Sequence, residues 1–197
     1  MKERVIRADY NDDTITIYQA YNELIANHAV LNQTFVSPPF KKERMTWIKP
    51  SFLWMMYRCG WAQKENQERI LAIKIKREGF EWALNNSSLS RYHTEKQDSY
   101  DDWKVELQKS PVRIQWDPER DIALNPLPYR SIQIGIKGIA VDKYLSEWIV
   151  QIEDITEKCK SIQNLINKGL KNKAMELIPQ ESLYPLTQNI ATKINSF

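Results

Sequence analysis

Three arginines on predicted strands are candidates for binding an anion. Arg44, Arg113 and Arg130 each lie on a segment predicted as a strand, or at its start, beside apolar neighbours that would limit side-chain motion. The planar guanidinium of arginine can donate two parallel hydrogen bonds to a phosphate or a carboxylate. The alternative is that each arginine pairs with an acid of the chain itself, such as Asp117 or Glu119. The sequence therefore indicates an anion site but leaves open which arginines serve it.

A lysine and a serine stand at the predicted start of a helix, on either side of Pro50. Proline suits the first helical position because its missing N–H would have no partner there. Helix N-termini attract anions, so Lys49 and Ser51 are candidate ligand-binding residues. The alternative is that Ser51 is an ordinary helix cap.

Hydrogen-bonding side chains occupy one face of two predicted strands, at residues 112–117 and 131–136. Gln115, Ser131 and Gln133 share this polar face if the strands pair. An amide can both donate and accept, which suits it to reading a carboxamide or a base edge. The alternative is a face of the sheet that only contacts solvent. We take Gln133 as a candidate catalytic residue.

The elements that must position these side chains lie mainly between residues 14 and 61. Residues 14–21 predict a strand with Gln19 and Tyr21 on one face, and residues 4–10 predict its hairpin partner. Residues 44–48 predict a strand that carries Thr46, followed by a helix at residues 50–59 that ends at Gly60. Trp54 in that helix is expected to be buried. We expect one concave pocket formed by Arg44, Lys49, Arg130 and Gln133, with Gln19 and the candidate catalytic Tyr21 near its rim.

The remaining pattern predicts an α+β fold with a largely antiparallel sheet, which could be split in two, and flanking helices. Strand 67–76 precedes helix 77–85, a mobile loop at residues 86–97 and a helix that begins at Ser99. From residue 139 the spacing of Tyr144, Trp148 and Ile152 predicts a helix, and residues 154–167 predict another. We expect one domain at residues 1–168 and a peripheral C-terminal helix and tail at residues 169–197.

Composition excludes several classes of protein. The five glycines, together with the absence of GxSxG, Walker and GxGxxG motifs, disfavour hydrolase elbows, P-loops and Rossmann folds. Two histidines and two cysteines are too scattered to predict a metal site. The start of the chain has no apolar core of a signal peptide, and no apolar run approaches a membrane span. We expect a cytoplasmic protein that does not enter a membrane.

Several strings resemble the domain-of-unknown-function family numbered 4291. They are IRADY, IYQAYN, RMTWIKPSFLWMMYR, QWDPER and LPYRSIQIGI, within a match from about Val5 to Ile166. The resemblance implies a cytosolic protein of one domain and supplies no reaction.

The order of elements is also similar to the opening of ADP-ribosyltransferase domains, which bind NAD in a cleft between two antiparallel sheets. Those domains use a polar or basic residue on the first strand, an aromatic or hydroxyl residue on the second and a Glu or Gln on a later strand. The resemblance implies that Tyr18 or Gln19, Thr46 or Ser51, and Gln133 fill these places.

Two hypotheses follow. The first is a nucleotide-using enzyme, with NAD bound in a cleft whose ligand-binding residues are Gln19, Arg44, Thr46, Lys49, Ser51, Arg113 and Arg130. The second is a non-catalytic module that binds nucleic acid or a nucleotide, in which basic groups hold phosphates and an aromatic side chain stacks on a base.

Overall fold

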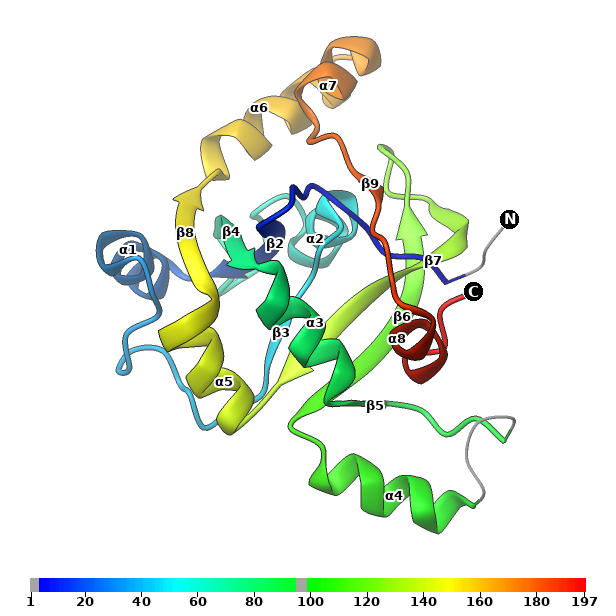
Figure 1. Ribbon diagram of the computed structural model, residues 1–197. Coiled ribbons are helices and arrows are strands. Elements are labelled where there is room, and N and C mark those ends of the chain that lie inside the picture. The colour runs from blue at the N-terminus through cyan, green and yellow to red at the C-terminus, as the bar shows by residue number, and fades with distance from the viewer. Residues whose placement is uncertain (1–3, 95–98) are drawn as a thin grey trace.

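Two antiparallel or mixed sheets form the frame of the molecule (Figure 1). The computed structural model describes residues 4–94 and 99–197. The first sheet has the order β2–β4–β8 and is antiparallel throughout; its strands are β2 (Thr14–Tyr21), β4 (Arg69–Lys76) and β8 (Ile149–Asp154). The second has the order β3–β7–β6–β5, with only β5 parallel to its neighbour; its strands are β3 (Thr46–Ile48), β5 (Ser87–Leu89), β6 (Val112–Arg120) and β7 (Pro126–Ile136). The fold is therefore α+β with the sheet split in two.

Helices surround both sheets, and α6 and α7 lie at the opposite end of the molecule from α4 (Figure 1). In the described part of the chain they are α1 (Glu23–Asn32), α2 (Phe52–Cys59), α3 (Arg77–Asn85), α4 (Tyr100–Lys109), α5 (Ile139–Lys143), the π-helical turn η1 (Tyr144–Trp148), α6 (Thr156–Asn167), α7 (Lys171–Leu177) and α8 (Gln188–Lys193).

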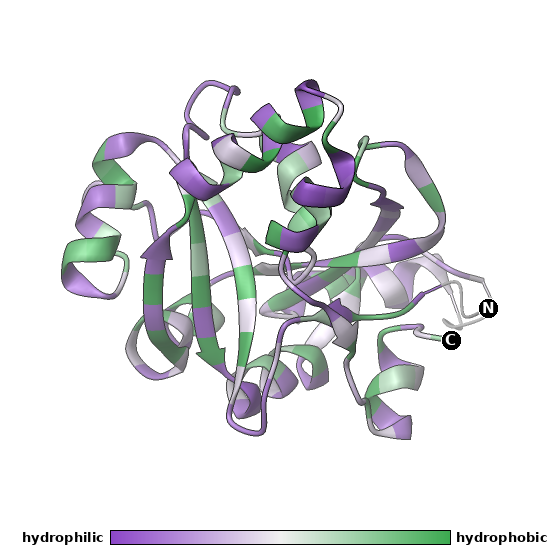
Figure 2. Ribbon diagram, turned by 90° about the horizontal axis from the view of Figure 1, so that it is seen from above, coloured by the Kyte–Doolittle hydropathy of each residue, from purple (hydrophilic) through white to green (hydrophobic). Residues whose placement is uncertain are grey.

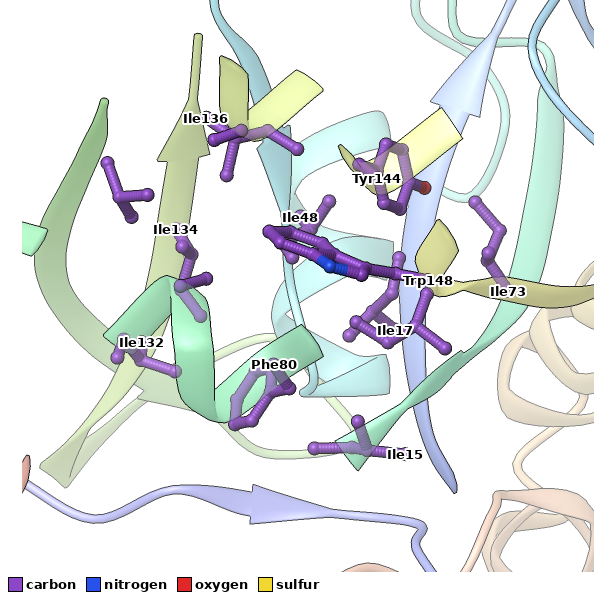
Figure 3. Packing of buried hydrophobic residues seen from close by; sticks show 14 of the residues in the cluster. Ile15, Ile17, Ile48, Ile73, Phe80, Ile132, Ile134, Ile136, Tyr144 and Trp148 are labelled. Atoms are coloured by element: carbon purple, nitrogen blue, oxygen red, sulfur yellow. The ribbon is translucent and has the colours of Figure 1, made fainter. Parts of the chain in front are cut away.

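The main hydrophobic core lies between the two sheets. Strands of both sheets carry alternating bands of high and low hydropathy, so that each presents an apolar face to the other (Figure 2). Ile17 of the first sheet and Ile134 of the second are fully buried. Trp148 lies among these side chains, close to Ile48 and Phe80 (Figure 3). This packing fixes the separation of the sheets.

A second core joins the other face of β2 to α2 and α6. Tyr18, Phe52, Met56, Cys159 and Ile162 belong to it, and all are almost fully buried. Helix α2 therefore stands on the first sheet beside the place where β2 approaches β3.

Several local predictions are confirmed. Asn22 caps α1 by accepting a hydrogen bond from the Ile25 N–H at 3.0 Å. Ser51 caps α2, and Gly60 ends it with a left-handed φ of 59°. Trp54 is buried, with 5% of its surface exposed. The same cap chemistry that is readable in the sequence therefore sets the bounds of both helices.

The helix predicted from residue 139 to Ile152 is wrong in its last four residues. The chain is helical only as far as Trp148, and Ile149–Asp154 form β8, which pairs with β4. Tyr144, Trp148 and Ile152 are all buried, as a helical stripe requires, but Ile152 reaches the core from a strand. Pairing with the free edge of β4 overrides the helical spacing.

Two further expectations need correction. Residues 7–8 form a short strand, β1, that pairs with β9 (Ser182–Leu183). The hairpin with β2 is confined to the residues next to the turn, where Tyr10 bridges Ile15 and the Thr16 N–H donates to the Asp9 carbonyl oxygen at 2.8 Å. The predicted loop at residues 86–97 contains the buried strand β5, and its last residues lie outside those described. Both differences arise because partners far along the chain take up backbone hydrogen bonds.

The C-terminal residues pack more closely than a peripheral tail. Tyr184, Ile190 and Ile194 are buried in the main core. The N–H of Arg4 donates to the Phe197 carbonyl oxygen at 3.1 Å, and the reverse bond is equally long. Arg4, the first described residue, accordingly lies beside the C-terminal Phe197; the described part of the chain therefore begins close to where it ends (Figure 1).

Candidate functional site

A cavity of about 510 Å³ opens where the edges of the two sheets meet. The edges come together at one backbone hydrogen bond, from the Tyr18 N–H to the Lys49 carbonyl oxygen at 2.7 Å. The cavity volume lies within the usual range for ligand sites. The lining residues come from β2, β3, α2, β6, β7 and the intervening loops: Gln19, Ala20, Tyr21, Met45, Thr46, Trp47, Lys49, Met55, Arg58, Gln67, Gln115 and Gln133.

A buried hydrogen-bond network ties β2 to β3 at the cavity wall. Gln19 Nε2 donates to Thr46 Oγ1 at 2.8 Å and to Tyr21 Oη at 3.0 Å, while Gln19 Oε1 accepts from Tyr144 Oη at 2.7 Å. Tyr21 Oη and Thr46 Oγ1 also share a hydrogen bond of 2.8 Å. Burial raises the pKa of Tyr21 to about 12, so its hydroxyl keeps its proton at neutral pH. The network therefore presents fixed hydroxyl groups to the cavity.

Lys49 is a buried amine on the cavity wall, with 6% of its surface exposed. Its Nζ donates to the Trp47 carbonyl oxygen at 3.0 Å and lies 5.7 Å from the centre of the Trp54 ring. Within residues 4–94 and 99–197 it forms no ion pair. Burial, followed by the nearby charge of Arg58, lowers the pKa of Lys49 to about 7. A neutral amine and a cation are therefore both populated near neutral pH.

The cavity combines cations and amides without acids. Arg58, an exposed residue of α2, supplies a second positive charge beside Lys49. Among the described residues that line the cavity there is no aspartate or glutamate, whereas four are glutamines. Two cations without a lining carboxylate favour an anionic ligand, because the ligand would relieve their mutual repulsion.

Two of the glutamines are held by one aspartate. Gln115 and Gln133 are directly paired across β6 and β7, and Asp117 follows on the same face of β6. Asp117 Oδ2 accepts from Gln133 Nε2 at 2.7 Å, and Asp117 Oδ1 accepts from Gln115 Nε2 at 3.0 Å. The orientation of both amides is thereby set by a group just behind the cavity wall.

Five of the nine predicted site residues line the cavity: Gln19, Tyr21, Thr46, Lys49 and Gln133. The expectation that Arg44 and Arg130 converge with them is wrong in its geometry. Arg44 is exposed in the turn before β3, and Arg130 lies three residues before Gln133, on the opposite face of β7. Arg130 donates to the Trp116 carbonyl oxygen at 3.3 Å and lines a separate cavity of about 100 Å³.

Arg113 lies on the cavity face of β6 but beside Gly135 rather than beside Gln133. Gly135 leaves room for Met45 and Trp47, since a Cβ there would meet the Met45 sulfur at 2.7 Å and Trp47 Cη2 at 2.9 Å. Arg113 is therefore two residue pairs along the ladder from the Gln115–Gln133 pair, and it does not line the cavity.

The start of α2 is occupied by the protein's own groups. Ser51 Oγ accepts from the Trp54 N–H at 3.2 Å and donates to Glu119 Oε1 at 2.9 Å, while the Phe52 N–H donates to Glu181 Oε1 at 2.6 Å. Burial, followed by the charge of Glu119, raises the pKa of Glu181 to about 8. The idea that this helix start holds a ligand anion needs correction, because the carboxyl side chain of Glu181 already takes that place.

Sequence reasoning did not place Arg58 or Gln67 in the cavity, and Gln115, although recognised on one polar face with Gln133, was not chosen as a site residue. For Gln115 the signal was present, because it alternates with apolar residues directly opposite Gln133. Gln67 and Arg58 have no local pattern that distinguishes them, since they reach the cavity only through the placement of α2 and the loop before β4. For the part of the chain that is described, no cluster of three or more potential metal ligands is found, and none of its helices is long and apolar enough to cross a bilayer.

Comparison with known protein families gives a match over most of the chain. The model of a family described as a domain of unknown function (DUF4291) matches residues 5–184. A search of curated proteins found no match.

Proposed function

This chain belongs to the family of the domain of unknown function DUF4291, and from the residues that line its cavity we propose that the cavity binds an anionic nucleotide, with NAD as the candidate ligand. The observation that carries the proposal is Lys49, a buried cavity lysine that forms no ion pair with any described residue. An unpaired buried cation is unfavourable for stability, so its presence in a cavity favours a role in binding.

The cavity residues divide into two chemical groups. Lys49 and Arg58 would bind the pyrophosphate, since both are donors and carry or can acquire a positive charge. Tyr21 and Thr46 would donate to or accept from sugar hydroxyls, because the Gln19 network fixes their positions. The residues present therefore fit a nucleotide that carries both charge and hydroxyl groups.

We assign the protein to the nucleotide-using enzymes, as a transferase that resembles NAD-dependent ADP-ribosyltransferases. NAD supplies an activated ADP-ribosyl group, whose transfer breaks the bond between nicotinamide and the ribose. Gln133 and Tyr21 are the proposed catalytic residues. A polar wall with few acids suits such a reaction, which needs the reacting groups held in place more than it needs strong acid–base catalysis.

The test measures binding and turnover separately. Calorimetric titration with NAD and with inorganic pyrophosphate is compared between the wild type and Lys49→Met, and nicotinamide release is followed by chromatography. We expect NAD to bind to the wild type and Lys49→Met to weaken binding about tenfold or more, the order for a hydrogen bond to a charged group. Lys104→Met, at an exposed position of α4, is the matched control and should bind as the wild type does.

Each outcome has a distinct meaning. Binding with release of nicotinamide supports the transferase. Binding without release of nicotinamide, whatever acceptor is added, supports the nucleotide site and contradicts the transferase. A wild type that binds neither NAD nor pyrophosphate contradicts the proposal. Strongly salt-dependent binding to an oligonucleotide, unaffected by Lys49→Met, would instead support the non-catalytic nucleic-acid module.

A further inference from the structure

We propose that Asp117 makes the cavity selective for a ligand group with N–H donors, such as a primary carboxamide, by turning the amide oxygens of Gln115 and Gln133 toward the ligand. This inference rests on the proposed nucleotide site and names the part of the ligand that the β6–β7 wall reads. The ribose–pyrophosphate part would be bound elsewhere in the same cavity, by Lys49 and Arg58.

Asp117 determines which end of each amide is free. An ionised carboxylate only accepts hydrogen bonds, so it must face the NH₂ group of each glutamine and not the oxygen. The Nε2–Oδ distances of 2.7 Å for Gln133 and of 3.0 and 3.3 Å for Gln115 agree with this orientation. Reversing either amide would place two acceptors against each other. The orientation is therefore a consequence of the charge on Asp117.

Both amide oxygens remain without a donor. Gln115 Oε1 and Gln133 Oε1 accept no hydrogen bond from any residue in the described ranges. Both side chains are part-buried and line the cavity. An acceptor that lines the cavity and has no partner in the protein is available to a ligand that donates.

The spacing of the two acceptors limits the donor to a compact group. Directly paired residues of an antiparallel sheet have Cβ atoms about 4.5–5.5 Å apart, so the two amides are neighbours. A primary carboxamide carries two hydrogens on one nitrogen and can donate to both. From the sequence, the glutamines were expected to donate and accept at once, but Asp117 leaves them only the accepting role.

The test compares two ligands of equal charge that differ only in the donor. NAD and its 3-acetylpyridine analogue are titrated into the wild type, Asp117→Asn and Gln133→Met. The analogue replaces the carboxamide NH₂ with a methyl group, so it keeps the carbonyl and loses both donors. Because the two ligands have the same charge, the ratio of their Kd values reports on the donor contact and not on the net charge of the site.

We expect the wild type to prefer NAD by about tenfold or more, because the analogue leaves two acceptors unpaired. In Asp117→Asn either amide can turn, since asparagine both donates and accepts, and the preference should fall to less than about threefold. Gln133→Met removes one acceptor without a charge change and should lower the preference too. Melting temperatures of both variants verify that they are folded.

The outcomes separate this inference from the proposed function. If NAD and the analogue bind to the wild type equally well, the nucleotide site stands and the assignment of Asp117 is overturned. If Asp117→Asn keeps the full preference while folded, the assignment is likewise overturned. If neither ligand binds to the wild type, the proposed function fails and the inference fails with it.

Discussion

At the scale of single residues, Lys49 is the most informative side chain in the cavity. It is buried, has one hydrogen bond to a carbonyl oxygen and carries a pKa lowered to about 7. Its unfolded-state pKa is close to 10.5, so the unfolded chain binds the proton more tightly than the folded chain between pH 7 and 10.5. The folded protein therefore carries a destabilising charge that is tolerated at the cavity.

Lys49→Met is expected to stabilise the protein in the absence of ligand, by roughly 2–4 kcal/mol below pH 7. The wild type should gain stability as the pH rises from about 7 to 10.5. Over this range Lys49 is neutral in the folded protein, while the unfolded chain still binds the proton and loses it only near pH 10.5. The advantage of the variant should shrink over the same range. Urea unfolding at a series of pH values measures this difference, and Lys104→Met serves as the exposed control. A variant that is less stable than the wild type at pH 6 contradicts the account.

The cavity residues were only partly predictable. Lys49, Gln133, Gln19, Tyr21 and Thr46 could be chosen from strand alternation and from the start of a helix, and all line the cavity. The three predicted arginines, Arg44, Arg113 and Arg130, were the stronger chemical signal, but none of them lines the cavity. The sequence around a strand shows which of its residues share a face, but not which residues of distant strands that face will meet. The burial of Lys49 was not predictable either, since it depends on the contact between two sheet edges.

At the scale of elements, α2 illustrates how far local chemistry reaches. Its residues, its serine cap and its glycine end follow from the sequence. Its start is completed by Glu119 and Glu181, which come from β6 and from the segment before β9. These partners are 68 and 129 residues away along the chain, beyond any local pattern.

Ser51→Ala should destabilise the protein by roughly 1–3 kcal/mol, since it removes a helix cap and a buried partner of Glu119. Ser51 was first a candidate for binding the ligand, so the two roles predict different results. A structural role requires a lower denaturation midpoint and an unchanged Kd for NAD, measured by chemical unfolding and calorimetry. A tenfold weaker Kd at unchanged stability would return Ser51 to the binding site.

Gly79 lets the backbone of α3 pack directly against Trp148 of η1. A Cβ at this position would overlap the indole of Trp148, which lies within the main core. Gly79→Ala should therefore destabilise the fold by about 1–3 kcal/mol, although alanine favours helices. A double-mutant cycle with Trp148→Leu should show that the two substitutions are coupled. Additive effects would mean that the predicted overlap is absent. The control is Glu78→Ala, at an exposed position of the same helix.

The largest difference between the predicted and the observed fold is β8. Its residues follow a helical stripe without a proline or glycine to mark the change, and the strand forms because β4 has a free edge. The order and type of most other elements were predictable from periodicity and caps. Pairings between distant segments, such as β1 with β9 and β5 with β6, were not.

At the scale of the whole molecule, the cavity is a consequence of the split sheet. β2 and β3 are edge strands that meet beside one backbone hydrogen bond, from Tyr18 to Lys49, and through the side-chain hydrogen bonds of Gln19 and Tyr21 to Thr46. The cavity opens at this junction. The main core keeps the sheets at a fixed separation, so the cavity walls are held by the rigid part of the fold. Such a preformed cavity can bind a ligand without a large rearrangement.

The measurement that tests the central claim most directly is the number of protons taken up when NAD binds. Calorimetric titration at pH 7 in buffers with different ionisation enthalpies gives this number. If the pyrophosphate binds at Lys49, the pKa of Lys49 must rise on binding, and the wild type should take up roughly half a proton per site at pH 7. Lys49→Met should bind more weakly with no uptake. Binding that takes up no proton in the wild type, or the same uptake in Lys49→Met, would contradict the account.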